Sequence, residues 1–280
     1  MATSAPDLVT ATAPRAQPAA GAGRDVAMRV AGVSKHYKTA SGSVHALEDI
    51  DLDVHQGEFV TILGPSGCGK TTLLWGMSGL HELTRGTVTL NGTPVTGPRP
   101  EIGMIFQEAN LLPWRNLARN IRFPFEIKRI DPAPYEARIA GLLNEVGLAG
   151  FEAKFPRELS GGMQQRASIV RCLSFDPDVI LMDEPFGALD AFTRDEMNLL
   201  IQKIWMETRK TIVFVTHNVT EAIFLADRVV VMSPRPGRIA HVFPIDLPRP
   251  RTIEQTFTPA FIEVVLKIKA TIQHGGGTTR

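Results

Sequence analysis

One stretch restricts the folds open to this chain more than any other: a glycine-rich loop between an apolar segment and a helix. Residues 57–64, GEFVTILG, indicate a buried strand that ends in glycine, and residues 71–80, TTLLWGMSGL, indicate the helix that follows. Between them, residues 64–72 read GPSGCGKTT, which contains the spacing G-x-x-x-x-G-K-[ST]. A strand, a loop of this kind and a helix in this order predict an α/β core.

The loop has the composition of a phosphate-binding loop. Its glycines allow the backbone to turn sharply, so that backbone N–H groups and the helix N-terminus point at phosphate oxygens. Lys70 supplies a positive charge to the β- and γ-phosphates, and Thr71 offers a hydroxyl ligand for Mg²⁺. The alternative is a glycine turn that only connects strand to helix, but a chance match to the motif in this context is uncommon. We expect a nucleotide to contact Gly64, Pro65, Ser66, Gly67, Cys68, Gly69, Lys70, Thr71 and Thr72.

Three ionisable side chains follow two further predicted strands. Residues 178–185, DVILMDEP, indicate an apolar strand that ends in Asp183 and Glu184, and residues 211–217, TIVFVTH, indicate another that ends in His217. The carboxyl edge of an open α/β sheet is where ligands bind. We expect Asp183 to hold Mg²⁺, Glu184 to activate the attacking water and His217 to contact the γ-phosphate. Solvated strand ends are the alternative for all three.

A second glycine-rich segment, LSGGMQQR at residues 159–166, opens another predicted helix. Ser160, Gly161 and Gly162 together with the helix N-terminus can form a second anion-binding surface. The spacing does not decide whether this surface serves the same nucleotide or one that another copy of the chain holds. Taken alone, the segment also fits an ordinary helix start with a serine cap.

Strand-like and helical segments alternate along the rest of the chain. MRVAGV (residues 28–33) and IDLDV (50–54) indicate early strands, whereas residues 108–172 show helical spacing, which suggests a helical insertion. Prolines predict breaks within the insertion at Pro113, Pro124, Pro132 and Pro156. Residues 234–251 look irregular and poor in strands, and PAFIEVVLKIKATI (259–272) indicates one amphipathic helix before a glycine-rich tail.

Composition narrows the functional class. Thirty basic and twenty-nine acidic residues give a formal charge of +1, which leaves no general electrostatic footprint for nucleic acid. No apolar run approaches the roughly 18 residues of a membrane span. Cys68 and Cys172 fit a reducing compartment. Residues 1–25 are rich in Ala, Pro, Thr and Gly; we expect a disordered lead-in, with a transit peptide as the weaker alternative.

Taken in order, these motifs resemble the ATP-binding cassette (ABC) superfamily over residues 28 to 240. The motifs are GPSGCGKTT, Gln107 in IGMIFQEAN, LSGGMQQR, VILMDEP, GALD and His217 in VTHNVTEA. The resemblance implies an α/β P-loop NTPase fold of the ABC ATPase type, a mixed-sheet core with an inserted helical subdomain. It divides the chain into the lead-in at 1–25, an ATPase domain at 26–240 (core 26–107 and 173–240, helical subdomain 108–172) and a C-terminal extension with one helix at 241–280.

The resemblance also implies roles that the residues alone do not give. The ATPase would form a head-to-tail homodimer in which Ser160 to Gly162 of one copy close over ATP held by the other. Gln107 would contact nucleotide and Mg²⁺ and join the site to a membrane partner, and Asp190 would communicate across the dimer. Tyr37, in SKHYKT, matches the aromatic residue on which adenine stacks; a surface tyrosine is the alternative.

The segments QEANLLPWRNLARNI and VTHNVTEAIFLADRVVVMSPRPGRI are similar to the nitrate, sulfonate and taurine importer branch. The implied assembly has two copies of this ATPase at the cytoplasmic face of the membrane, two permeases and an extracytoplasmic solute receptor. Trp114 fits partner contact or helix packing equally. Met163 stands where the usual motif has glutamine, and Arg166 has no assigned role. The rival classes are a soluble cassette ATPase acting on nucleic acid or ribosomes and a non-hydrolysing regulatory module.

Overall fold

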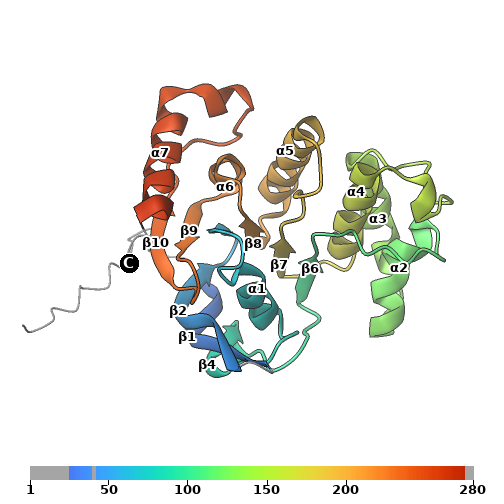
Figure 1. The fold of residues 1–280 in the computed structure, drawn as a ribbon. Helices are drawn as coiled ribbons and strands as arrows, with labels where there is room; N and C mark the ends of the chain where they lie inside the picture. Colours follow the sequence, from blue (N-terminus) through green and yellow to red (C-terminus); the bar gives the residue numbers. More distant parts are fainter. Residues whose placement is uncertain (1–24, 40–41, 275–280) are drawn as a thin grey trace, which may run out of the picture.

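Two β-sheets organise the molecule (Figure 1), and the computed structural model describes residues 25–39 and 42–274. The strands of the larger sheet are β3 (Phe59–Leu63), β6 (Ile102–Ile105), β7 (Val179–Asp183), β8 (Thr211–Thr216), β9 (Arg228–Met232) and β10 (Ile239–Pro244). Their order is β10-β9-β3-β8-β7-β6; β10 runs antiparallel to β9, and the other neighbours are parallel. The expected mixed α/β sheet is therefore confirmed.

Strands β3, β7, β8 and β9 are buried along their whole length because helices or a second sheet cover both faces. Alternate residues of β8 enter different cores: Ile212 and Phe214 pack with the core of α5 and α6, and Val213 and Val215 with the core of α1. The helices on this framework are α1 (Lys70–Ser78), α5 (Ala191–Thr208), α6 (Val219–Leu225) and α7 (Pro259–His274).

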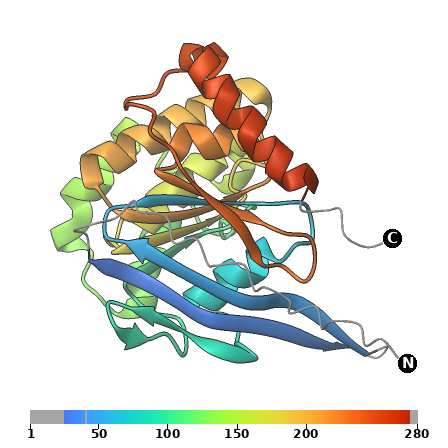
Figure 2. The same ribbon diagram turned by 90° about the vertical axis from the view of Figure 1, so that its left-hand side faces the viewer.

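The smaller sheet is antiparallel and has the order β2-β1-β4-β5. Its strands are β1 (Val26–Thr39), β2 (Gly42–His55), β4 (Arg85–Leu90) and β5 (Thr93–Pro94). The long β1–β2 pair lies across the side of the larger sheet that carries α1 (Figure 2). Both early strands that the sequence predicts are thus present, and β2 reaches the glycine-rich loop at the start of α1.

Three helices lie together beyond the β6 end of the large sheet (Figure 1). They are α2 (Leu117–Lys128), α3 (Glu136–Glu145) and α4 (Gly161–Leu173), accompanied by the short 3₁₀ turns η1 (Ala133–Tyr135) and η2 (Pro156–Glu158). The side chain of Asn116 caps α2, and Ser160 caps α4. Helix α4 packs against both α2 and α3, which fits the helical texture expected between residues 108 and 172.

Two local predictions are wrong. Pro124 does not break the helix, because α2 runs through it; a proline removes one helical hydrogen bond, but Ile121 and Phe125 on either side are buried in the core. Residues 234–251 are not poor in strands, because β10 spans residues 239–244 and continues across residue 240, the expected end of the core. Pairing with β9 supplies the backbone hydrogen bonds that the local sequence did not reveal.

The C-terminal part wraps back over the sheet through η3 (Glu254–Phe257) and α7 (Figure 1). Helix α7 contacts α6 and β9, and its Phe261 and Ile268 are buried. The predicted lead-in at residues 1–25 lies outside the described residues except for its last position, and so does the end of the glycine-rich tail. Within the described ranges, no helix has the length and hydropathy that a membrane span requires.

Candidate nucleotide site

The glycine-rich loop runs from the end of β3 to the start of α1, where the sequence places it. Gly67 and Gly69 have φ of 75° and 103°, in the left-handed region that favours glycine. A Cβ on Gly69 would lie 2.8 Å from the carbonyl oxygen of Ala46, so a side chain would also collide with β2. Lys70 is 5% exposed, and its Nζ donates to the carbonyl oxygens of Gly64 (3.0 Å) and Pro65 (3.2 Å).

A cavity of about 240 Å³ opens above this loop. It is lined by Tyr37, Val44, Ala46, Ser66, Gly67, Gly69, Lys70, Thr71, Thr72, Glu184 and Arg235. Strands β1 and β2 form one wall through Tyr37 and Val44, which are register partners. The Tyr37 hydroxyl lies 3.5 Å from Oγ1 of Thr72 and 3.3 Å from Nδ1 of His81, so the aromatic ring stands beside the loop.

A hydroxyl and a carboxylate meet at the end of β7. Oγ1 of Thr71 donates to Oδ1 of Asp183 over 2.9 Å. Burial raises the pKa of Asp183, and the nearby Glu184 charge raises it further, whereas the Thr71 hydrogen bond and the Lys70 charge lower it. Oxygen donors of these two kinds are the ligands that Mg²⁺ prefers, so the pair fits the cation expected from the sequence.

Glu184, the residue after β7, lies between Lys70 and His217 at the carboxyl edge of the large sheet. Its backbone lies in the left-handed region (φ 43°), a strained conformation for a residue other than glycine, and its N–H donates to the carbonyl oxygen of Val215 over 3.0 Å. Oε1 of Glu184 lies 3.4 Å from Nζ of Lys70, and Oε2 lies 2.8 Å from Nδ1 of His217. The structure therefore brings Lys70, Glu184 and His217 into one chain of contacts.

Gln107 lies just after β6, close to this edge but outside the cavity lining. A Cβ on Gly187 would be 3.5 Å from Nε2 of Gln107 and 3.9 Å from Oε2 of Glu184. The glutamine and the catalytic candidate therefore face the same small space. Gly64, Pro65 and Cys68 also do not line the cavity, because Gly64 and Pro65 act through their carbonyls on Lys70 and the Cys68 side chain is buried.

The second glycine segment does not reach this cavity. Ser160 accepts a hydrogen bond from the Met163 N–H at the start of α4, and none of Ser160, Gly161 and Gly162 lines the cavity within the chain. Open space surrounds the position that a Cβ on Gly161 would occupy. The N-terminus of α4 is thus an exposed glycine surface at a distance from the chain's own phosphate-binding loop (Figure 1).

Sequence reasoning missed the loop after β9 as part of the site. Nε and Nη2 of Arg235 donate to the carbonyl oxygen of Gly67 over 3.2 and 3.1 Å, and the guanidinium lines the cavity. A Cβ on Gly237 would lie 2.0 Å from the carbonyl oxygen of Cys68. The only signal in the sequence is the run SPRPGRI, in which two prolines flank the arginine.

The remaining candidates have clear positions. Asp190 caps α5 by accepting hydrogen bonds from Thr193. Trp114 is 70% exposed, which disfavours helix packing as its explanation. Arg166 pairs with Glu196 on α5 over 2.7 Å, so it joins α4 to the core framework within the chain.

Comparisons with known proteins show the family of this chain. The chain matches the ABC transporter family over residues 47–187. The chain belongs to the ABC transporter family. It is 52% identical to the taurine import ATP-binding protein TauB of Jannaschia sp. over 198 residues, which cover 71% of this chain and 74% of that protein. It is 41% identical to the aliphatic sulfonates import ATP-binding protein SsuB of Bacillus cereus over 244 residues, which cover 87% of this chain and 95% of that protein.

A solved ABC structure has the same fold. The ATP-binding cassette MJ0796, in a dimeric post-hydrolysis state bound to ADP and Pi, matches with a TM-score of 0.69 and 30% identity, over 79% of this chain and 99% of that one. The ABC ATPase fold and the kinship with importer ATP-binding subunits expected from the sequence are confirmed, and the nucleic-acid alternative finds no support among these relatives. As an ABC ATP-binding subunit, this protein binds and hydrolyses ATP to drive transport.

Proposed function

We propose that this ABC subunit powers the uptake of a small organosulfonate, with taurine and aliphatic sulfonates as the leading solutes. The observation that carries the proposal is the 52% identity to a subunit named for taurine import and the 41% identity to one named for aliphatic sulfonate import. Nitrate, the third solute suggested by the sequence, is the alternative that the experiment below separates from the sulfonates.

In this proposal the cavity above the loop holds ATP. The triphosphate lies along the N–H groups of the loop from Gly64 to Thr72, and its charge replaces the carbonyl partners of Lys70 Nζ. Tyr37 stacks on the adenine ring, since it forms the wall of the cavity beside Thr72. Arg235 keeps the loop in shape through Gly67 and adds a second positive charge at the cavity edge.

We assign the metal and the water by donor chemistry. Thr71 and Asp183 hold Mg²⁺, with Gln107 as a further oxygen ligand. The bound ion supplies charge neutralisation for the β- and γ-phosphate oxygens. Glu184 accepts a proton from the attacking water, and its left-handed backbone and the bond to His217 fix the carboxylate in place. His217 orients that carboxylate and contacts the γ-phosphate.

The exposed glycine surface of α4 acts on a second copy of the chain. Ser160, Gly161 and Gly162 close over the γ-phosphate bound by the partner, because within one chain they lie outside the cavity. Asp190 at the start of α5 communicates across this homodimer. Closure on ATP and opening after hydrolysis drive two integral-membrane permeases at the cytoplasmic face of the membrane, through Gln107 and the exposed Trp114. An extracytoplasmic solute-binding protein delivers the solute.

Uptake measurements test the solute. The gene is deleted in its host and restored either as wild type or as Glu184→Gln, and entry of labelled taurine, an alkanesulfonate and nitrate is followed. We expect wild type alone to restore uptake of one or both sulfonates. Restoration of nitrate uptake with no change in sulfonate uptake would overturn the solute assignment. Full activity of Glu184→Gln would overturn the role of the carboxylate instead.

A further inference from the structure

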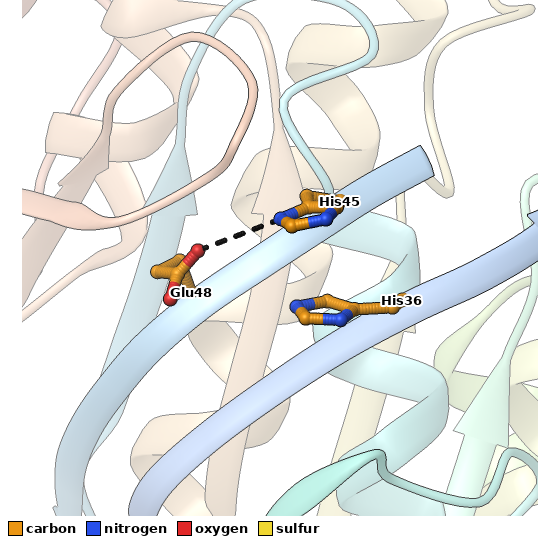
Figure 3. Close-up of side chains that lie close together, drawn as sticks. All are labelled: His36, His45 and Glu48. Atoms are coloured by element: carbon orange, nitrogen blue, oxygen red, sulfur yellow. Dashed lines mark ion pairs between the residues drawn. The ribbon is translucent and has the colours of Figure 1, made fainter. Parts of the chain in front are cut away.

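Three ligating side chains meet on the β1–β2 pair, outside the nucleotide cavity (Figure 3). His36 comes from β1, and His45 and Glu48 come from β2; one ligand atom of each lies within 4.8 Å of the other two. The two imidazole rings stack, with centroids 4.0 Å apart and planes 14° apart. Nδ1 of His45 lies 3.9 Å from Oε2 of Glu48.

An irregularity in the strand pairing creates this juxtaposition. In a regular strand, His45 and Glu48 would point to opposite faces, because side chains alternate with a period of two. Here Lys35 pairs with Leu47 and His36 pairs with His45, so Ala46 is an extra residue on β2. Such a bulge reverses the alternation and re-aims the side chains that follow it, which puts His45 and Glu48 beside His36.

One atom of the cluster lacks a partner. Nε2 of His36 is buried and makes no hydrogen bond within the described part of the chain. A buried polar atom without a partner is desolvated at a cost in free energy, so a ligand that engages the imidazoles would recover part of that cost. Arg238 approaches Glu48 only loosely, with its Nη2 at 3.9 Å from Oε2 of the carboxylate.

We propose that His36, His45 and Glu48 form a binding site for a divalent transition metal of the Zn²⁺ class. Two imidazoles and a carboxylate are a common zinc donor set, and water completes the tetrahedron. Mg²⁺ and Ca²⁺ do not fit, because they prefer six or more oxygen ligands. The lone pair of an imidazole nitrogen lies in the ring plane, and the two rings are nearly parallel, so one imidazole turns about its Cβ–Cγ bond on binding; the exposed His45 can do so.

The proposed metal site lies next to the nucleotide cavity, on the other side of the β1–β2 pair. Tyr37 and Val44, the register pair next to His36 and His45, line the nucleotide cavity. Because side chains of adjacent pairs point to opposite faces, the metal lies on the reverse side of the β1–β2 wall and ties the two strands together there. The inference rests on the three ligands alone and does not depend on the proposed solute or on the assigned catalytic roles.

Zinc titration of the full-length protein, free of nucleotide and of any histidine tag, tests the site. A chromophoric chelator competes for Zn²⁺ in the presence of a large excess of Mg²⁺, and Co²⁺ absorption reports the coordination geometry. We expect one Zn²⁺ per chain, not displaced by Mg²⁺, and a tetrahedral Co²⁺ spectrum. His36→Ala and His45→Ala should each weaken binding by at least about tenfold, equivalent to about 1.4 kcal/mol per factor of ten.

His241→Ala is the matched control, because His241 is an exposed histidine on β10 outside the cluster, and it should bind Zn²⁺ as wild type does. The exposed His45 keeps the experiment decisive even where His36→Ala folds poorly, and circular dichroism checks both variants. Absence of Zn²⁺ binding by the wild type, displacement by Mg²⁺, or equal affinity in wild type and His45→Ala would each overturn the proposal.

Discussion

At the scale of single residues, we expect nucleotide affinity to depend most on the side chain of Lys70. It is buried, and its ammonium contacts two loop carbonyls and Glu184, so water does not easily take over these contacts when the side chain is removed. We expect Lys70→Ala to lower ATP affinity by roughly a hundredfold, because charge-assisted contacts to phosphate contribute about 1.5–3 kcal/mol. Fluorescent nucleotide titration measures this change.

Lys38→Ala provides the control for that measurement. Lys38 is an exposed lysine on β1 next to Tyr37, but it does not line the cavity. Its removal should leave ATP affinity within a factor of about two, since a solvated surface charge contributes little. Equal losses in the two variants would mean that general charge, rather than the loop geometry, holds the nucleotide.

The sequence did not predict the position of every residue of the candidate site equally well. The position of the loop from Gly64 to Thr72 could be predicted because a local spacing fixes its backbone. The positions of Asp183, Glu184 and His217 could be predicted because the strand ends share one sheet edge. Arg235 could not be read, because its partner Gly67 lies 168 residues earlier in the chain. Only the completed sheet brings β9 beside β3, and with it the arginine beside the loop.

At the scale of elements, the turn after β9 packs directly against the phosphate-binding loop and against β2. Gly237 donates its N–H to the carbonyl oxygen of Ala46, and its own carbonyl accepts from the N–H of Glu48. A Cβ at this position would collide with the Cys68 carbonyl, so the loop backbone itself must move. We expect Gly237→Ala to lower ATP affinity at least about tenfold and to destabilise the fold by about 1–3 kcal/mol.

Binding is measured by calorimetry well below the unfolding temperature, which separates affinity from stability. Gly97→Ala is the matched control, because open space surrounds the position that a Cβ would take there. If Gly237→Ala bound ATP like the wild type, the turn would be a passive connection.

A buried ion pair joins Arg228 on β9 to Glu58, the residue before β3, and the same arginine also bonds to β2. Nη2 of Arg228 donates to Oε2 of Glu58 over 3.0 Å and to the carbonyl oxygen of Asp53 over 2.6 Å, and the paired side chains are 8% and 4% exposed. Glu58→Gln leaves the guanidinium buried without a counter-charge, and we expect a loss of about 3 kcal/mol in the free energy of unfolding. Urea denaturation followed by circular dichroism measures the loss.

Asp53→Asn tests whether burial of the ion pair is the reason for the loss of stability expected in Glu58→Gln. The Asp53 side chain holds the exposed Arg29 through two hydrogen bonds, so the same kind of pair is broken at the surface. The urea midpoint of this variant should stay almost unchanged, because solvent screens exposed pairs. A loss comparable to that of Glu58→Gln would contradict the argument from burial.

Element prediction succeeded where local pattern and tertiary context agree. The buried strands β7 and β8 and the helix α1 carry their own signals in apolar, β-branched runs and in the glycine loop. The continuation of α2 through Pro124 was not predicted, because packing of α2 against α4 overrides the local preference of proline. Strand β10 was not predicted either, because its pairing with β9 is not visible in the local sequence. Both effects depend on residues far away in the sequence, so the residues on either side of a position do not predict them.

At the scale of the whole molecule, we expect the site to be complete only when two copies meet. Each chain carries a phosphate-binding cavity and, apart from it, an exposed glycine surface at the start of α4. We expect the Glu184→Gln variant to bind ATP, turn over very slowly and sediment as a dimer with ATP but as a monomer with ADP, because closure requires the γ-phosphate.

Adding Gly161→Glu to that variant tests the closing surface without disturbing the monomer. A side chain at Gly161 meets open space within one chain, and a carboxylate in the first turn of α4 suits the helix dipole, so folding and ATP affinity should be preserved. In the dimer the same carboxylate would face the partner's γ-phosphate, and two negative charges brought so close repel each other. Sedimentation velocity should therefore show only monomer with ATP, whereas Gly141→Glu, an equally open glycine on α3, should still give the dimer. A stable ATP dimer that contained Gly161→Glu would mean that the chains pair through another surface.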